Sequence, residues 1–157
     1  MFLLYTSTIV FNIIAYKYVK EMSANKIVHI WLFTISLQLL FDTFIDLKYH
    51  GYWYLTQGID YLAFPAYTLL IPPINVLFLE YFPFGRSMKG KALYIIIWTI
   101  LLLLYEMLVN LPPPWGYFHY GWWKFWYSCF MDPILLLILI GFYKIITKLE
   151  KKVKLGH

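Results

Sequence analysis

The stretch ALYIIIWTILLLLYEMLVNL, residues 92–111, holds one charged side chain, Glu106, among long apolar residues. A helix needs about 20 predominantly apolar residues to cross roughly 30 Å of hydrocarbon. Further apolar segments lie at about residues 1–16, 27–47, 61–79 and 125–146. We therefore expect an all-α integral membrane domain, a bundle of five transmembrane helices, with a basic tail at residues 147–157.

The composition supports this class. The 157 residues are 62% hydrophobic and only 13% charged, whereas soluble domains carry about 25% charged residues. The first apolar segment is short, but no basic region precedes it and no small-residue cleavage site follows, so a helix is favoured over a signal peptide. Cys129 is the single cysteine, and no Cys/His spacing predicts a metal site. No cofactor is expected.

The placement of basic residues predicts the orientation. Eleven of the 13 lysines and arginines lie in the first loop, the third loop and the tail. Positively charged loops stay in the cytoplasm, so the N-terminus should be outside and the C-terminus inside. The net charge of +5 then lies on the cytoplasmic side. We expect the positively charged loops and tail to bind anionic lipid headgroups rather than nucleic acid. The membrane-surface basic residues are Arg86, Lys89, Lys91, Lys148, Lys151 and Lys152.

The two outer loops are strongly aromatic. They read KYHGYWYLTQGIDY from Lys48 and PPPWGYFHYGWWKFWY from Pro112. Tyrosine and tryptophan prefer the headgroup zone, where an apolar ring meets a wet edge. We expect both loops to lie at the membrane interface.

Polar residues recur every four positions in the second segment, at Thr34, Gln38, Asp42 and Asp46. Such a stripe lies on one helix face and should point to other helices or to water. Glu106 and Asp132 fall at a similar depth, about 7–11 Å below the outer interface at 1.5 Å per residue, with no Lys or Arg at that level. The predicted pocket comprises Asp42, Glu106, Asp132, Gln38 and Asp46.

Two interpretations of these acids remain open. They lock helix packing as protonated or hydrogen-bonded groups, or they form a site for a proton, a cation or a small polar ligand. A metal site at His50 or His119 lacks any ligand spacing that would support it.

Three prolines predict helix breaks. Pro72 and Pro73 deny hydrogen-bond partners to the carbonyls of Thr68 and Leu69. Pro133 either opens a new helix capped by Asp132, or continues a helix and frees the carbonyl of Cys129.

No catalytic motif such as HExxH, GxSxG or a P-loop occurs. The leading hypothesis is a non-enzymatic multi-pass membrane protein with an acidic pocket in the outer leaflet. One alternative is a small secondary transporter or channel subunit, as a homo-oligomer or part of a larger membrane assembly. A membrane enzyme acting on lipid or cell-wall precursors is the second alternative.

Two stretches carry a resemblance, YFPFGRSMKGKALYIIIW from Tyr81 and GWWKFWYSCFMD from Gly121, together with Glu106. They resemble a family of small multi-pass membrane proteins of spore-forming Gram-positive bacteria, over segments two to five. That family has no assigned activity. The resemblance implies a bacterial cell membrane location and adds weight to Glu106 and Asp132.

Overall fold

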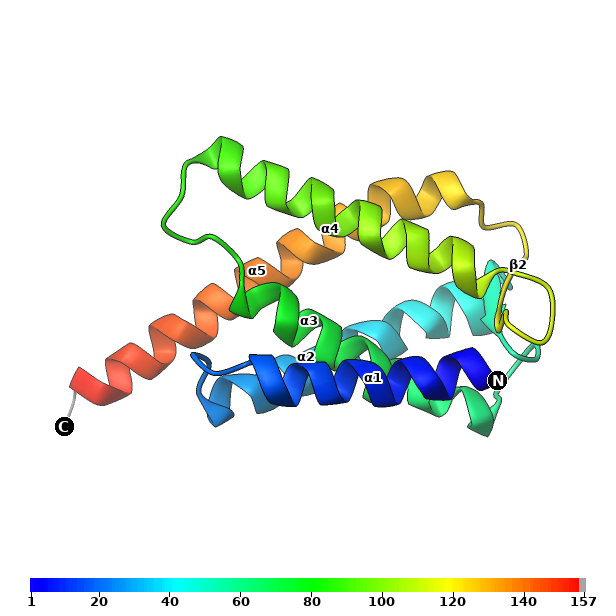
Figure 1. The fold of residues 1–157 in the computed structure, drawn as a ribbon, viewed down its shortest axis with the longest axis horizontal. Helices are drawn as coiled ribbons and strands as arrows, with labels where there is room; N and C mark the ends of the chain where they lie inside the picture. Colours follow the sequence, from blue (N-terminus) through cyan, green and yellow to red (C-terminus); the bar gives the residue numbers. More distant parts are fainter. Residues whose placement is uncertain (156–157) are drawn as a thin grey trace.

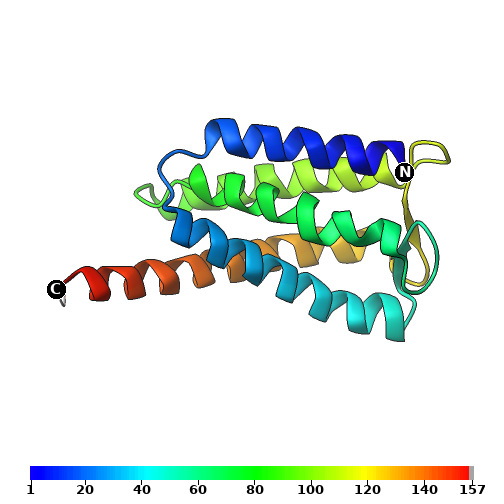
Figure 2. The same ribbon diagram turned by 90° about the horizontal axis from the view of Figure 1, so that it is seen from below.

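The computed structural model describes residues 1–155, in which five α-helices dominate (Figure 1). Successive helices run in opposite directions, and the two ends of the chain lie at opposite ends of the bundle (Figures 1 and 2). The expected all-α class is confirmed. The helices are α1 (Phe2–Tyr18), α2 (Ala24–Asp42), α3 (Ile71–Glu80), α4 (Met88–Val109) and α5 (Phe125–Leu155).

Four helical stretches are long and apolar enough to cross a membrane, so the fold is that of a helical membrane protein. α1 has 17 residues, is shorter than these four, and packs along α3. The four stretches are Ala24–Lys48, Tyr61–Glu80, Met88–Val109 and Phe125–Val153.

The third apolar segment is assembled from three helical pieces. A 3₁₀ turn, η2 (Tyr61–Ala63), and a π-helical turn, η3 (Ala66–Leu70), precede α3. Pro72 and Pro73 stand in the first turn of α3, where a missing N–H is tolerated. The change of helix type therefore comes immediately before the prolines.

The two carbonyls that these prolines deprive of partners bind side chains of other helices. Trp31 Nε1 on α2 donates to the Thr68 carbonyl at 3.0 Å. Asn12 Nδ2 on α1 donates to the Leu69 carbonyl at 2.7 Å. The two carbonyls that lack partners within their own helix thus hold α1 and α2 against the central segment by hydrogen bonds.

Helix α5 runs through Pro133 without interruption, so the continuous helix is the geometry adopted. It also passes residue 147, where the tail was expected to begin, because no helix-breaking residue occurs between Pro133 and Leu155 other than Gly141. Beyond the bundle it projects away from the other helices (Figure 1).

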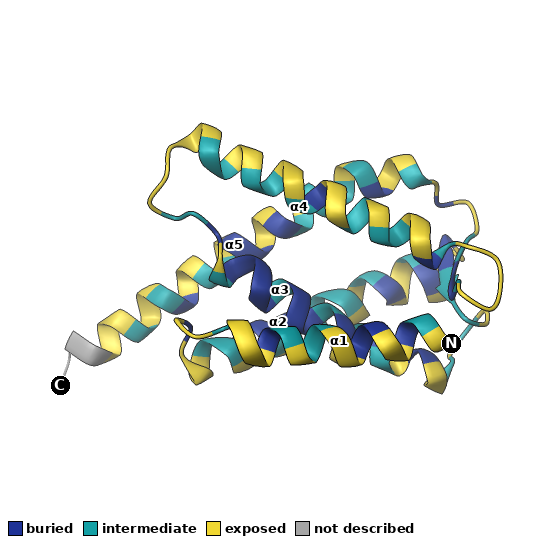
Figure 3. Ribbon diagram, viewed as in Figure 1, coloured by how far each residue is buried: buried dark blue, intermediate teal, exposed yellow. Residues whose placement is uncertain are grey.

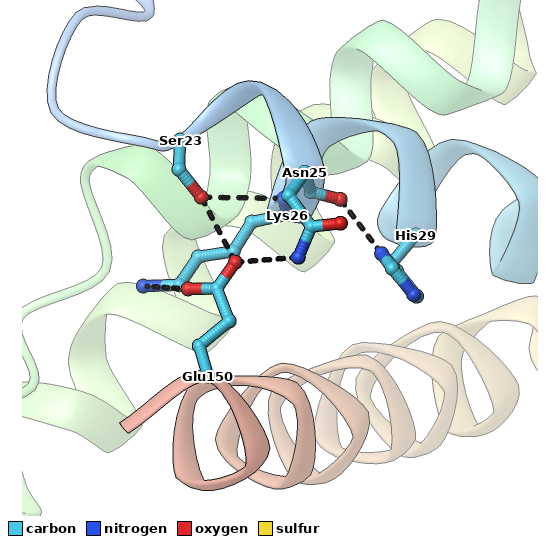
Figure 4. A network of polar contacts seen from close by, with 5 residues as sticks. All are labelled: Ser23, Asn25, Lys26, His29 and Glu150. Carbon is cyan, nitrogen blue, oxygen red and sulfur yellow. Dashed lines mark hydrogen bonds and ion pairs between the residues drawn. The ribbon is translucent and has the colours of Figure 1, made fainter. Parts of the chain in front are cut away.

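A polar network joins this extension to the start of α2 (Figure 4). Glu150 Oε1 accepts hydrogen bonds from Asn25 Nδ2 at 2.7 Å and Ser23 Oγ at 3.1 Å. Glu150 Oε2 pairs with Lys26 Nζ at 3.6 Å. Ser23 also caps α2 by accepting from the Lys26 N–H. The network fixes α5 against α2 at the end where the basic loops lie.

The two aromatic loops pair with each other in a short ribbon, which the sequence did not predict. Strand β1 (Tyr52–Tyr54) pairs antiparallel with β2 (Phe118–Tyr120), and Trp53 faces His119. Gly121 donates to the Gly51 carbonyl at 2.8 Å, and any Cβ at Gly121 would collide with the His50 carbonyl. We call this end of the bundle the ribbon end.

The interior divides into two clusters along the bundle. Segment α3 lies at the centre and is largely buried, whereas the outward faces of the other helices are exposed (Figure 3). The ribbon-end cluster comprises Leu4, Tyr52, Ala66, Leu70, Ile74, Val109, Tyr117, Phe118 and Trp123. The opposite cluster comprises Met22, Ile30, Val76, Phe78, Leu79, Phe82, Leu136, Leu139 and Ile140.

Candidate functional site

A cavity of about 240 Å³ lies inside the bundle, between α2, α3, α4 and α5. At roughly 30 Å³ per water molecule this is the space of about eight waters. Aromatic side chains of the ribbon and its flanks, among them Tyr52, Tyr54 and Trp123, line it at the ribbon end. Most of the remaining wall is aliphatic, so its few polar groups determine what it can bind.

Glu106 is held by donors from two other elements. Its Oε1 accepts hydrogen bonds from the Tyr120 hydroxyl on β2 and from Ser128 Oγ on α5, the latter at 2.7 Å. Trp123 Nε1 donates to Ser128 Oγ at 3.0 Å, which fixes the serine. Burial and the bond to Glu106 raise the pKa of Tyr120 above its usual range, so this hydroxyl keeps its proton and donates.

Asp132 lies one helical turn after Ser128 on the same face of α5 and lines the same cavity as Glu106. Its side chain is half-buried. No hydrogen bond from residues 1–153 reaches its carboxyl group. The cavity thus brings together Glu106, whose carboxyl group accepts two hydrogen bonds, and Asp132, whose carboxyl group accepts none from the described residues.

Asp42 belongs to a different cluster, although Gln38 lines the main cavity. Asp42 Oδ1 accepts from the Tyr52 hydroxyl at 2.6 Å and from Gln38 Nε2 at 2.9 Å. Gln38 Nε2 also reaches the Tyr54 hydroxyl at 3.3 Å. Burial raises the pKa of Tyr52 and of Tyr54 well above the usual range, so both phenols stay protonated.

Asp42 and Asp46 line a second cavity of about 170 Å³, and Tyr54 lines both cavities. The five polar residues that the sequence grouped in one pocket therefore lie in two. Glu106, Asp132 and Gln38 face the main cavity, and Asp42 and Asp46 face the second. The physical reason is the ribbon, which inserts Tyr54 between the acids of α2 and those of α4 and α5.

The predicted membrane-surface residues lie away from both cavities. Arg86, Lys89 and Lys91 surround the start of α4, and the tail lysines lie near the end of α5. Arg86, Lys89, Lys148, Lys151 and Lys152 are exposed, and Lys91 is half-buried. Among the residues whose side chains the structure describes, 1–153, no group of three or more His, Cys, Asp and Glu side chains is arranged to hold a metal ion by itself.

Sequence reasoning missed Tyr52, Tyr120 and Ser128, which donate hydrogen bonds to the acids. It also missed Trp123, which bonds Ser128, and Tyr54, which bonds Gln38. A signal for the ribbon does exist, because Tyr-Trp-Tyr at 52–54 and Phe-His-Tyr at 118–120 are both short runs of ring-bearing residues, and tyrosine, phenylalanine and tryptophan are enriched in strands. Each run is three residues long, which is too short to distinguish a strand from an interfacial loop.

Comparison with known protein families, curated proteins and solved structures finds no match.

Proposed function

We propose that the chain crosses a bacterial cell membrane five times, with the ribbon end outside and the basic end in the cytoplasm. The alternating helix directions support this topology (Figures 1 and 2). The concentration of lysine and arginine at the end opposite the ribbon supports the orientation. In this orientation Arg86, Lys89 and Lys91 contact anionic headgroups of the inner leaflet, and assembly into an oligomer stays a prediction.

We further propose that the main cavity binds a small organic cation with an apolar body. The observation that carries this proposal is the Asp132 carboxyl group, which lacks a hydrogen bond from the described residues and shares a cavity with Glu106. Two carboxyl groups in a water-poor space are unfavourable without a compensating charge or donors. An ammonium group supplies both.

The rest of the wall fits the same kind of molecule. Aromatic rings attract cations through their faces, and Tyr52, Tyr105 and Trp123 all line the cavity. Leucine, isoleucine and methionine side chains supply an apolar surface for the body of the ligand. A strongly hydrated inorganic ion would leave that apolar wall without a partner.

The main cavity is closed on the side of the basic end. This favours binding of a ligand in the cavity over its passage through the membrane. Below the cavity, the opposite cluster fills the bundle with buried side chains such as Phe78, Leu79 and Leu139. A transporter would have to open this packing, whereas a binding protein would keep it.

The test compares two probes of nearly equal shape, phenethylammonium and the neutral phenethyl alcohol. A ligand that binds only the folded state raises its melting temperature with concentration. We expect phenethylammonium to stabilise the purified full chain in detergent saturably, and the alcohol at least tenfold more weakly.

Asp132→Asn is the informative variant, because it removes a charge without removing a described hydrogen bond. It should abolish the preference for the ammonium probe. Glu21→Gln, which neutralises an exposed acid in the loop between α1 and α2, should keep it. Equal stabilisation by both probes, or an unchanged preference in Asp132→Asn, would contradict the proposal.

A further inference from the structure

The second cavity differs from the main one in the chemistry of its wall. It lies between the end of α2 with the π-helical turn η1 (Thr43–Lys48) and the segment that contains η2 and η3. Its lining includes three carboxyl groups, those of Asp42, Asp46 and Asp60, and the tyrosines Tyr54 and Tyr67. This concentration of oxygen atoms distinguishes it from the mainly apolar main cavity.

Two carboxylate oxygens in this wall are buried and unpartnered. Asp42 and Asp46 are each 6% exposed. Within residues 1–153, Asp42 Oδ2 and Asp46 Oδ1 have no hydrogen-bond partner, although Asp42 Oδ1 has two. Buried polar atoms are nearly always satisfied in native proteins, and leaving a carboxylate oxygen unpaired is unfavourable. These two oxygens therefore need a partner from outside the chain.

The local backbone places the two acids beside the same cavity. Asp42 is the last residue of α2, and Asp46 lies inside η1. Tyr49 N–H donates to the Phe44 carbonyl five residues earlier, the wide hydrogen bond of a π turn. Turns of this kind occur often at functional sites.

Lys48, the lysine nearest in the chain, forms no salt bridge with Asp42 or Asp46. Lys48 directs its ammonium group over the rings of Phe44 and Tyr49, 5.8 Å and 5.0 Å from the ring centres. His50 contacts Asp46 through its backbone, where its N–H donates to the Asp46 carbonyl oxygen at 2.9 Å, and its ring lies near enough to act electrostatically on the Asp46 carboxyl group. No Lys or Arg lines the cavity among the described residues.

Asp60 adds a fixed negative charge at the rim. Thr56 Oγ1 donates to its Oδ2 at 2.7 Å, and the Leu62 N–H donates to its Oδ1 at 2.9 Å. These bonds hold the pKa of Asp60 below its usual range, so it is ionised at neutral pH. Asp60 therefore attracts a cation to this cavity electrostatically, while each of its oxygens already accepts one hydrogen bond.

We infer that Asp42 and Asp46 bind a partly hydrated divalent cation of the Mg²⁺ type in this second cavity. Magnesium prefers oxygen ligands, is held by one or two carboxylates, and keeps several of its waters. Only two acids offer free oxygens, which agrees with the lack of any described group of three ligands. A cavity of about 170 Å³ has room for the ion and the waters that complete its shell.

The site is independent of the ammonium site proposed above, because the two use different acids. They still share a wall, since Gln38 Nε2 donates both to Asp42 Oδ1 and to the Tyr54 hydroxyl. Failure of one proposal would leave the other standing.

The experiment uses the full chain in detergent after removal of metals with a chelator. Equilibrium dialysis against MgCl₂ at constant ionic strength should show one saturable Mg²⁺ per chain, with a parallel rise in melting temperature. The Asp46→Asn variant should lose both effects, and Asp132→Asn should keep both. Asp60→Asn should bind at least severalfold more weakly, because it loses only the rim charge.

Other results would overturn the inference. Absence of saturable Mg²⁺ binding to the wild-type chain would do so without reference to any variant. Equal binding by Asp46→Asn would place the ion elsewhere. If Asp46→Asn fails to fold, displacement of Mn²⁺ by Mg²⁺ on the wild-type chain, followed by electron paramagnetic resonance, decides the question. A free-Mn²⁺ spectrum at all ratios would refute the site.

Discussion

The side-chain amide of Asn12 donates a hydrogen bond to the main-chain carbonyl of Leu69 at 2.7 Å. Leu69 is the residue whose carbonyl Pro73 cannot pair within the helix. At the preceding residue, Trp31 does the same for the Thr68 carbonyl, which Pro72 leaves free. The two prolines of the central segment are thus matched by one polar side chain from each flanking helix.

Replacing either donor should destabilise the bundle. We expect Asn12→Ala and Trp31→Phe each to lower the free energy of unfolding by about 1–3 kcal/mol, because each leaves a carbonyl unpaired in a water-poor interior. Thermal unfolding in detergent measures the change. Ser36→Ala is the matched control, since Ser36 bonds only the Leu32 carbonyl of its own helix. Equal losses in all three variants would contradict the account.

The serine between Trp123 and Glu106 should be important for the main cavity. Ser128→Ala removes the acceptor of the indole N–H and one donor to Glu106, so we expect a loss of about 1–3 kcal/mol. Trp123 is 8% exposed, and freeing its indole should alter the tryptophan fluorescence spectrum. Ser128→Thr keeps the hydroxyl and should restore much of the stability. If Ser128→Ala changes neither the stability nor the fluorescence spectrum, the hydrogen bonds from Trp123 to Ser128 and from Ser128 to Glu106 do not contribute to stability.

The buried tyrosines predict alkaline sensitivity. Burial raises the pKa of Tyr52 and Tyr54 above the value of about 10 in an unfolded chain. A group whose pKa is raised by folding contributes stability that is complete below the unfolded pKa and is lost at higher pH. The melting temperature should therefore fall as the pH rises beyond about 10.

Two variants make this pH test specific. Tyr52→Phe removes one buried phenol, so its melting temperature should fall less steeply with pH than that of the wild type. Tyr16→Phe removes a tyrosine that is 92% exposed and should leave the slope unchanged. Identical slopes in all three proteins would show that the ribbon phenols do not stay protonated in the folded state.

Cysteine labelling tests the proposed orientation. After Cys129→Ser, a cysteine at Gln57 lies in the ribbon-end loop and one at Ser87 lies in the loop before α4. A membrane-impermeant maleimide should label Gln57→Cys in intact cells and Ser87→Cys only after permeabilisation. The reverse pattern would invert the topology, and labelling of both in intact cells would place the two loops on one side.

The sequence predicted well those features that depend on local pattern. The steps of four along α2 placed one polar stripe inward, and Thr34 and Asp42 are indeed buried. Asp46, at the end of this stripe, was expected to be a solvated residue at the membrane boundary and is buried instead. The denied carbonyls of Thr68 and Leu69 were also predicted. In each case the physical cause, which is helix periodicity or a missing N–H, acts over a few residues. It can therefore be recognised from the amino-acid sequence.

Features that depend on contacts between distant residues were not predictable. Tyr54 separates two cavities only because β1 pairs with β2, and their paired residues Tyr54 and Phe118 are far apart in the chain. The partners of Glu106 follow from the same pairing, since Tyr120 reaches it from β2. Similarly, Glu150 and Asn25 meet at the basic end through the length of α5. The expected depth in the membrane placed Asp42, Glu106 and Asp132 at one level. Depth alone could not determine which of these acids line the same cavity.

The most direct test of the central claim is a calorimetric titration of the full chain with phenethylammonium, repeated in the presence of saturating Mg²⁺. The account predicts one site per chain in the wild type, whether or not Mg²⁺ is present, and a loss of at least tenfold in affinity in Asp132→Asn. Binding that Mg²⁺ abolishes, or that Asp132→Asn leaves unchanged, would contradict the assignment of the main cavity to an organic cation.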